Sequence, residues 1–287
     1  MKPTEMQLEG EGVWSSLLQH WSALGPPLRP SEVDLDFTRN CGNRLLDTIA
    51  THDATALVLG VTPELCELGL ARVRRVIAVD QSAAMIGAIW PGPANRDHSA
   101  LQADWSKIPL ESESVDLALS DGSFTPLRYP DEHESVFAEL HRLLRPRACV
   151  IMRCFVQGAI RETETCLSSD LRAARIRSFH TFKWRLAMAL QTSSEDGVKL
   201  HAIWKNLTTE LPDPVLAARA FSWHLEEIRT IESYRYSDVC YYFPTLEEQC
   251  RVAQRSGFTL IEKFTPDYEL GDRCPTLVFQ REGFHES

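Results

Sequence analysis

The sequence of 287 residues lacks several features that define other classes of protein. It contains no apolar run of transmembrane length, and its first ten residues have no apolar signal core. It also shows no internal repeat and no low-complexity segment. We therefore expect a cytoplasmic protein that does not contact a membrane.

Positively charged residues are outnumbered by negatively charged ones. The formal net charge is −10, with 30 Lys and Arg against 40 Asp and Glu. Binding to a nucleic-acid backbone needs a basic surface, so this balance disfavours nucleic acid as the main partner. The dinucleotide fingerprint G-x-G-x-x-G is also absent, which disfavours a nicotinamide-dependent dehydrogenase.

The eight cysteines form no metal-binding pattern. No pair has C-x-x-C spacing, and no Cys/His set has the spacing of a zinc site. Several lie in apolar runs, where buried free thiols are the default, with a catalytic thiol as the alternative. Because there is also no obvious carboxylate cluster, we expect no metal.

One stretch, Thr55–Leu65, gives the clearest structural signal in the sequence. Ala56–Leu59 is a short apolar run, Gly60 interrupts it, and Pro63 opens a segment with helical spacing. This order is typical of a buried strand, a tight turn and a helix N-terminus that can face a polar ligand. Twenty residues after Gly60, a second apolar run ends in Asp80. The spacing predicts a βαβ unit that delivers a carboxylate to a ribose diol, with a ligand-free βαβ unit as the alternative.

Further strands and helices alternate along the chain. This alternation predicts an α/β fold with a mostly parallel sheet, helices on both faces and ligands beyond the carboxyl ends of the strands. The last two strands are expected to form an antiparallel pair. The expected strands are 56–59, 76–79, 99–102, 117–119, 148–152, 258–264 and 276–279, with helices at 82–90 and 131–144.

Helices are also expected near both ends. Glu5–Leu24 has an amphipathic pattern and forms either a core-packed helix or a lid. Ser31 and Asp34 have capping-box spacing for a helix that runs towards Ala50. Thr245–Glu248 repeats that spacing for a helix that ends near Gly257.

The region from Val156 to about Tyr242 is predicted to be helical, with helices around 179–190, 198–207 and 212–231. Tyr234–Tyr236 and Tyr241–Phe243 indicate an aromatic pocket wall or a dimer contact. The polar and aromatic candidates in this region are His180, Lys183, Arg185, His201, Trp204 and Trp223, with His180 the first candidate for a base.

Residues from about 54 to 154 resemble the class I S-adenosylmethionine-dependent methyltransferases. Leu57–Gly60 resembles the first strand and glycine loop of that family, and Val79-Asp80 its acidic second-strand end. Ala103–Trp105 resembles the turn whose Asp meets the adenine amine, and 108–146 follows the fourth strand to the fifth. The resemblance implies a Rossmann-like fold, S-adenosylmethionine as cofactor, and a helical insertion that serves as substrate cap.

The chain departs from the family pattern at the glycine loop. The usual G-x-G-x-G is replaced by Gly60-Val-Thr62-Pro-Glu64, and Val58 replaces the usual acidic residue. The signature Asn/Asp-Pro-Pro-Tyr/Phe is missing, which argues against methylation of an exocyclic amine. The loop leaves open whether Thr62 and Glu64 contact the aminoacid end of the cofactor.

The resemblance implies a set of cofactor contacts. Asp80 can accept both ribose hydroxyls, Asp104 can accept from the adenine amine, and Trp105 can cover the ring. The alternatives are a turn cap for Asp104 and core packing for Trp105. The predicted cofactor-binding residues are Gly60, Thr62, Glu64, Asp80, Gln81, Asp104, Trp105 and Ser120.

Catalytic and substrate-binding candidates follow from position. Asp121 follows the fourth strand and is either a base or a turn former next to Gly122. Arg29, in the rigid segment Gly25–Pro30, can meet a carboxylate, with a surface role as the alternative. The full prediction is Asp121 and His180 as catalytic residues, and Arg29, Ser123, Phe124, Tyr129 and Arg273 as substrate-binding residues.

We therefore expect a methyltransferase that acts on a small molecule, with O-, N- or C-methylation left open. Its parts are expected to be an N-terminal helical lid (1–52), a cofactor-binding core (53–155), a helical substrate cap (156–243) and a C-terminal completion of the core (244–287). The alternatives are a methyltransferase-like binding module without turnover, and another nucleotide-dependent enzyme. A homodimer is left open.

Overall fold

The computed structural model describes residues 18, 20–49, 53–93 and 97–283. Most of the helix predicted at Glu5–Leu24 lies outside these residues. Within the described part of that segment, Trp21–Ala23 forms a short 3-10 helix, η1.

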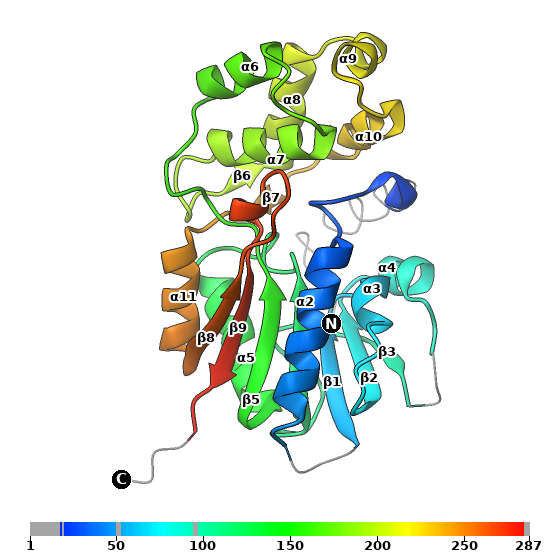
Figure 1. Cartoon of the computed structure of the whole chain (residues 1–287), viewed down its shortest axis with the longest axis vertical. Coiled ribbons are helices and arrows are strands. Elements are labelled where there is room, and N and C mark those ends of the chain that lie inside the picture. The colour runs from blue at the N-terminus through cyan, green and yellow to red at the C-terminus, as the bar shows by residue number, and fades with distance from the viewer. Residues whose placement is uncertain (1–17, 19, 50–52, 94–96, 284–287) are drawn as a thin grey trace.

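A seven-stranded sheet forms the centre of the molecule (Figure 1), in the order β3-β2-β1-β4-β5-β9-β8. β1 to β5 are parallel, β9 is antiparallel to β5, and β8 is antiparallel to β9. This confirms the predicted mostly parallel sheet with an antiparallel last strand. The strands are β1 Ala54–Leu59, β2 Val73–Asp80, β3 Ser99–Gln102, β4 Val115–Asp121, β5 Leu144–Arg153, β8 Phe258–Phe264 and β9 Thr276–Arg281.

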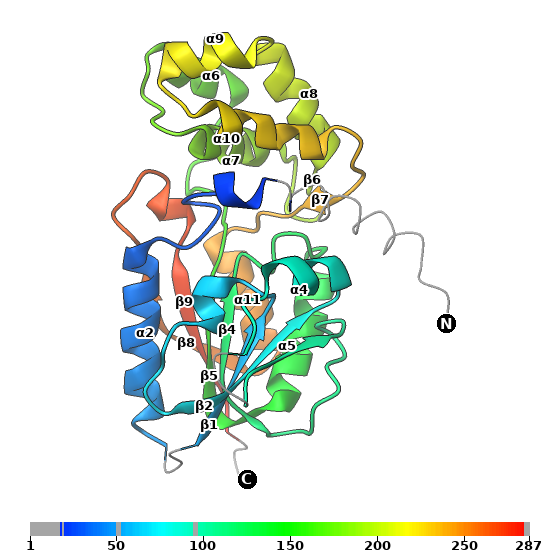
Figure 2. The same cartoon turned by 90° about the vertical axis from the view of Figure 1, so that its right-hand side faces the viewer.

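Helices cover both faces of this sheet (Figure 2). Successive strand residues point to opposite faces, so Leu57 and Leu59 pack with α5 (Asp131–Leu143) and α11 (Leu246–Arg255). Val58 points the other way and packs in the cluster that contains residues of α2 (Glu32–Leu46). Because both faces are buried, β1 needs an uninterrupted apolar run, which is the pattern seen in the sequence.

Two helix starts form as predicted. Ser31 and Asp34 make a complete capping box at α2, and Thr245 and Glu248 make another at α11. The helix that Pro63 opens, α3 (Pro63–Cys66), is only one turn long, and α4 spans Ala83–Ile89 within the predicted 82–90. One strand differs from prediction. β5 begins four residues earlier than the predicted 148, because Leu144 already pairs with Val115 across a register irregularity.

The region after β5 folds over the carboxyl ends of the strands (Figures 1 and 2). Its own core includes Phe182, which stacks with Trp223. The single helix predicted at 212–231 is wrong, because the chain breaks at Ser222, which has φ 58°. The elements are α6 Glu164–Arg172, α7 Phe179–Leu190, β6 Val198–Lys199, α8 Leu200–Glu210, α9 Pro214–Phe221, α10 Leu225–Arg229, η2 Thr230–Tyr234 and β7 Cys240–Tyr241.

The two connections between this region and the sheet lie side by side. The Gln157 N–H donates to the carbonyl of Pro244 at 3.0 Å, and Gln157 forms an isolated parallel bridge with Thr245. The buried amide of Gln191 donates to the carbonyl of Phe243 and accepts from its N–H, both at 2.8 Å. The segments that enter and leave the helical region are therefore joined by hydrogen bonds at one place.

A buried ion pair ties the strand ends to the segments around them. Arg153, at the end of β5, binds Asp121, at the end of β4, at 2.5 Å, and both side chains are buried. Arg153 also donates to the carbonyl of Pro27 at 2.7 Å and to the hydroxyl of Tyr268 at 3.4 Å. That hydroxyl donates in turn to Asp34 of α2 at 3.1 Å.

Replacing Arg153 is expected to destabilise the fold strongly. Arg153→Met leaves the Asp121 carboxylate buried without its counter-charge, which costs about 3–5 kcal/mol of unfolding free energy. Urea denaturation followed by circular dichroism measures the loss. The double variant Arg153→Met/Asp121→Leu should recover most of it, and an equal loss in the double variant would contradict this account.

Candidate cofactor and substrate pocket

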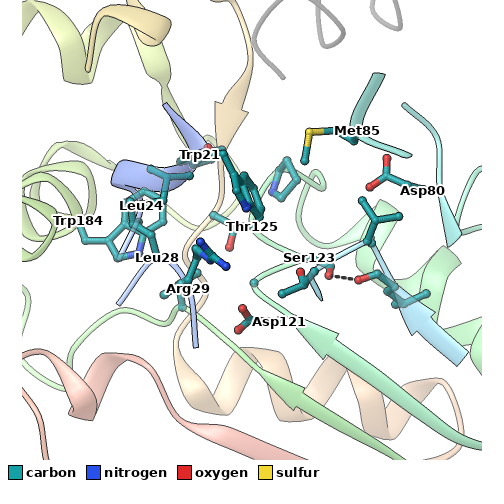
Figure 3. A pocket seen from close by; sticks show the side chains of 18 of the residues that line it. Trp21, Leu24, Leu28, Arg29, Asp80, Met85, Asp121, Ser123, Thr125 and Trp184 are labelled. Carbon is teal, nitrogen blue, oxygen red and sulfur yellow. Dashed lines mark hydrogen bonds between the residues drawn. The ribbon is translucent and has the colours of Figure 1, made fainter. Parts of the chain in front are cut away.

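A cavity of about 170 Å³ lies where the strand ends meet the helical region (Figure 3). Gly60, Asp80 and Asp121 reach it from β1, β2 and β4. The N-terminal segment and the helical region close the other sides. Their lining residues are Trp21, Leu24, Leu28 and Arg29 from the first, and Lys183, Trp184, Tyr234 and Tyr241 from the second.

Gly60 shapes the strand-end side of this cavity. Its φ of +94° lies in the region that favours glycine, and its N–H donates to the carbonyl of Val79 at 2.7 Å. A Cβ atom at this position would stand 4.0 Å from both Asp80 Oδ2 and Ser123 Oγ. The missing side chain therefore leaves space between these two residues for a ligand.

Asp80 is a mostly buried carboxylate at the cavity wall. Its Oδ1 accepts from the N–H of Ser82 at 2.8 Å. Burial raises the pKa of Asp80 to about 6, and the Ser82 hydrogen bond opposes that shift. Hydroxyl donors on the remaining oxygen would stabilise the charged form, so this site fits a vicinal diol.

Arg29 and Glu64 form an ion pair beside the glycine turn. Arg29 Nε lies 2.8 Å and its Nη2 2.6 Å from Glu64 Oε1, and the guanidinium lies over the ring of Trp21. The other oxygen, Glu64 Oε2, is buried without a hydrogen-bond partner among the described residues. Arg29 and Thr62 line the cavity, and Glu64 adjoins it through Arg29. This pairing can accommodate the carboxylate and ammonium of an amino acid.

Two side chains beside Asp80 are held by backbone carbonyls. Trp105 Nε1 donates to the carbonyl of Val79 at 2.6 Å, and Ser123 Oγ donates to the carbonyl of Leu59 at 2.8 Å (Figure 3). Met85 adds an apolar surface next to Asp80. Trp105 and Met85 therefore form a fixed apolar wall beside the carboxylate, as a flat ring requires.

Asp121 lines the cavity, but its side chain is already engaged by Arg153. Burial raises the pKa of Asp121, and the neighbouring Arg153 charge opposes that shift. An aspartate held in a buried ion pair must give up that interaction to accept a proton. Its predicted role as a base stays a prediction, and its observed contact is structural.

Besides Glu64, three predicted cofactor residues lie outside the cavity lining. Asp104 is exposed and accepts from the N–H and hydroxyl of Ser106, both at 2.8 Å, which corresponds to the turn-cap alternative. Gln81 is exposed, and its carbonyl accepts from Gln102. Ser120 is 3% exposed, and its hydroxyl has no partner among the described residues.

Four predicted catalytic or substrate residues also lie outside the lining. His180 Nε2 contacts the carbonyl of Ala23 at 3.0 Å, and burial lowers the pKa of His180 to about 3, so it is a weak base near neutral pH. Each of the other three is held elsewhere. Phe124 packs in the sheet core, the Tyr129 hydroxyl donates to the carbonyl of Glu248 at 3.4 Å, and Arg273 pairs with Glu162.

The helical region contributes lining residues that were absent from the predicted set of site residues. Tyr234 and Tyr241 lie in the wall, in agreement with one of the two roles indicated for their aromatic clusters, whereas Tyr236 is 85% exposed. Lys183 was only one of six polar and aromatic candidates. Within the described chain its Nζ is fully buried and lacks a hydrogen-bond partner, and burial lowers the pKa of Lys183 to about 7.

Part of the chain matches a known protein family. Residues 59–152 match the family model described as a methyltransferase domain. That span runs from the end of β1, through Gly60 and Asp80, into β5. No curated protein matches the chain in a sequence comparison.

Solved structures share the fold at low sequence identity. A Rhodobacter sphaeroides protein described as a Zn-dependent alcohol dehydrogenase has a TM-score of 0.60 and 17% identity, with 95% of this chain and 99% of that chain covered. Burkholderia thailandensis 1,6-didemethyltoxoflavin-N1-methyltransferase, with its acceptor and S-adenosylhomocysteine bound, has a TM-score of 0.51 and 14% identity, covering 98% and 93%. A methyltransferase in complex with the Haloferax volcanii activator Trm112 has 0.51 and 12%, covering 95% and 97%.

The sheet order and the match over residues 59–152 agree with the Rossmann-like fold of the class I S-adenosylmethionine-dependent methyltransferases. Residues 59–152 of this chain form a methyltransferase domain. Among the described residues, no group of three or more His, Cys, Asp and Glu could hold a metal ion. No helix in the described ranges has the length and apolar content needed to cross a membrane.

Removing the charge of Lys183 is expected to stabilise the protein. Lys183→Met should raise the unfolding free energy by roughly 1–3 kcal/mol near pH 7, because an unpaired buried polar group is costly. The gain should shrink from pH 7 to pH 10. In that window the folded protein binds fewer protons at Lys183 than the unfolded chain, where the ordinary pKa is 10.5.

Urea denaturation across this pH range measures the difference, with the exposed Lys205→Met as matched control. Other groups act on Lys183 or contact it: Glu227 from α10, His180 on α7, and Tyr234, which is bonded to Tyr241. Burial moves the pKa of His180 to about 3 and raises the pKa values of Tyr234 and Tyr241. His180 and the two tyrosines therefore do not titrate in this window. A gain that is independent of pH would contradict the assignment.

Proposed function

We propose that this protein transfers a methyl group from S-adenosylmethionine to a small molecule enclosed between the strand ends and the helical region 156–243. The observation that carries this proposal is the composition of the cavity wall. One side comes from β1, β2 and β4, and the other from α7, η2 and β7. A cavity of about 170 Å³ between these two walls fits a metabolite-sized acceptor.

The residues at the strand ends fit the cofactor. Asp80 would accept the ribose hydroxyls, Gly60 would leave room for the chain beyond them, and Trp105 would cover an aromatic ring. Arg29 would meet the carboxylate and the free oxygen of Glu64 the ammonium of the aminoacid end. When bound, S-adenosylmethionine supplies a methyl carbon activated by its sulfonium.

The protein's own contribution is alignment and exclusion of water. Asp80 and Met85 lie on one side of the pocket and Leu24, Leu28 and Trp184 on the other (Figure 3). A cofactor on the Asp80 side and an acceptor on the Trp184 side would face each other across the cavity. Holding two reactants in this way can contribute roughly 7–11 kcal/mol to the reduction of a barrier.

The fold neighbours support a small-molecule acceptor without deciding it. The Burkholderia enzyme holds 1,6-didemethyltoxoflavin, whereas the Haloferax methyltransferase is associated with the protein Trm112. The aromatic lining from the helical region favours the first kind of acceptor for this chain. A dimer contact and a cytoplasmic location stay predictions.

Binding of S-adenosylhomocysteine tests the cofactor pose. Asp80→Ala should weaken binding by about tenfold to hundredfold, because two hydrogen bonds to a charged group are lost. For the native protein, affinity should fall as the pH drops through about 6, where Asp80 takes up a proton. Asp80→Asn should be weak and independent of pH in this window. Titration calorimetry measures all three proteins.

Turnover separates the proposed enzyme from its main alternative. Wild-type protein supplied with S-adenosylmethionine and a metabolite panel should release S-adenosylhomocysteine with one acceptor class, and Asp80→Ala should lose this activity. Tight cofactor binding with no turnover on any small molecule would favour a binding module or a macromolecular acceptor. Absence of cofactor binding to folded wild-type protein would overturn the proposal.

A further inference from the structure

Lys183 lies on α7 at the helical side of the cavity and is 0% exposed. Its Nζ has no hydrogen-bond partner and no ion pair among the described residues. The ammonium instead lies over two aromatic rings, 5.1 Å from the centroid of Tyr234 and 5.8 Å from that of Phe179. A lysine is almost never fully buried unless it is paired, so its position calls for a partner that the described chain does not supply.

The other charged side chains of the cavity are already matched. Arg29 is paired with Glu64, and Asp121 is paired with Arg153. Asp80, on the opposite side from Trp184, fits the ribose diol. Lys183 is therefore the charged lining residue to which neither the described protein nor the proposed cofactor pose assigns a partner.

The positive charges in the cavity also favour a bound anion. The cofactor carries a sulfonium cation, and Lys183 places a second cation in the same mostly apolar cavity. Glu227 of α10 acts on Lys183 only through space, without an ion pair. Two like charges in a water-poor cavity repel each other, so an anion located between them would stabilise both.

The walls around Lys183 indicate the shape of this anion. Its neighbours Trp184, Tyr234 and Tyr241 line the cavity, with ring centroids of Trp184 and Tyr241 5.3 Å apart. Phe155, from the end of β5, extends the same aromatic surface. Such walls bind flat apolar molecules through ring contacts and offer few hydrogen bonds.

We propose that the methyl acceptor is a flat aromatic molecule with an acidic oxygen, bound as a carboxylate or phenolate anion whose charge pairs with Lys183. This inference rests on the proposed function, because it places the acceptor opposite the cofactor. Lys183 is thus a specificity-determining residue that selects anionic acceptors over neutral ones of the same shape.

Matched probe pairs test the inference on protein saturated with S-adenosylhomocysteine. One pair is 2-naphthoate and 2-naphthamide, and the other is 4-nitrophenolate and nitrobenzene, at about pH 7, where the Lys183 ammonium and the phenolate are both populated. Titration calorimetry should give at least about tenfold tighter binding of one anion than of its neutral counterpart. The pair that shows this preference identifies a carboxylate or a phenolate acceptor.

Two variants assign the preference to Lys183. Lys183→Met should lose the preference while it keeps S-adenosylhomocysteine affinity, and Lys205→Met, which removes an exposed charge from α8, should keep both. Equal binding of anion and neutral probe, no binding of either anion, or an unchanged preference in Lys183→Met would each overturn the inference. Loss of S-adenosylhomocysteine binding in the wild type would instead count against the proposed function.

Discussion

The buried pair between Arg153 and Asp121 is the constraint on which the arrangement of the pocket depends. A guanidinium removed from water must be surrounded by acceptors, and here those acceptors come from separate parts of the chain. By binding Asp121 at the end of β4, the carbonyl of Pro27 and the hydroxyl of Tyr268, Arg153 fixes the N-terminal segment against the strand ends. Arg29 follows two residues after Pro27, so the same contacts help to position the Arg29–Glu64 pair.

The pocket combines two kinds of surface with different origins. At the strand ends, backbone carbonyls fix Trp105 and Ser123, and the turn at Gly60 is fixed by its own hydrogen bond. On the helical side, the rings of Trp184 and Tyr241 pack against each other, and the Tyr241 hydroxyl is bonded to Tyr234 rather than to the backbone. The first surface suits a constant cofactor, whereas the second can change its specificity through side-chain substitutions alone.

Much of the fold could be predicted from local sequence patterns, and so could part of the site. The order of apolar runs, the capping boxes, Gly60 and Asp80 are encoded within a few residues, and the structure has them where they were expected. Lys183 could not be singled out, because its chemistry arises from burial by residues that are distant in sequence. Asp104 and His180 have suitable side chains, but a local contact with Ser106 occupies the first, and a contact with the distant Ala23 occupies the second.

The joined entry and exit of the helical region have a consequence for how such proteins can diversify. Because Gln157 and Thr245 meet in one bridge, the chain leaves the sheet and returns to it at nearly the same point. The sheet therefore imposes little restriction on the length or topology of what lies between these residues, since closing a longer loop costs little additional entropy. Recombination at this junction can exchange one helical region for another while the sheet keeps its strand register.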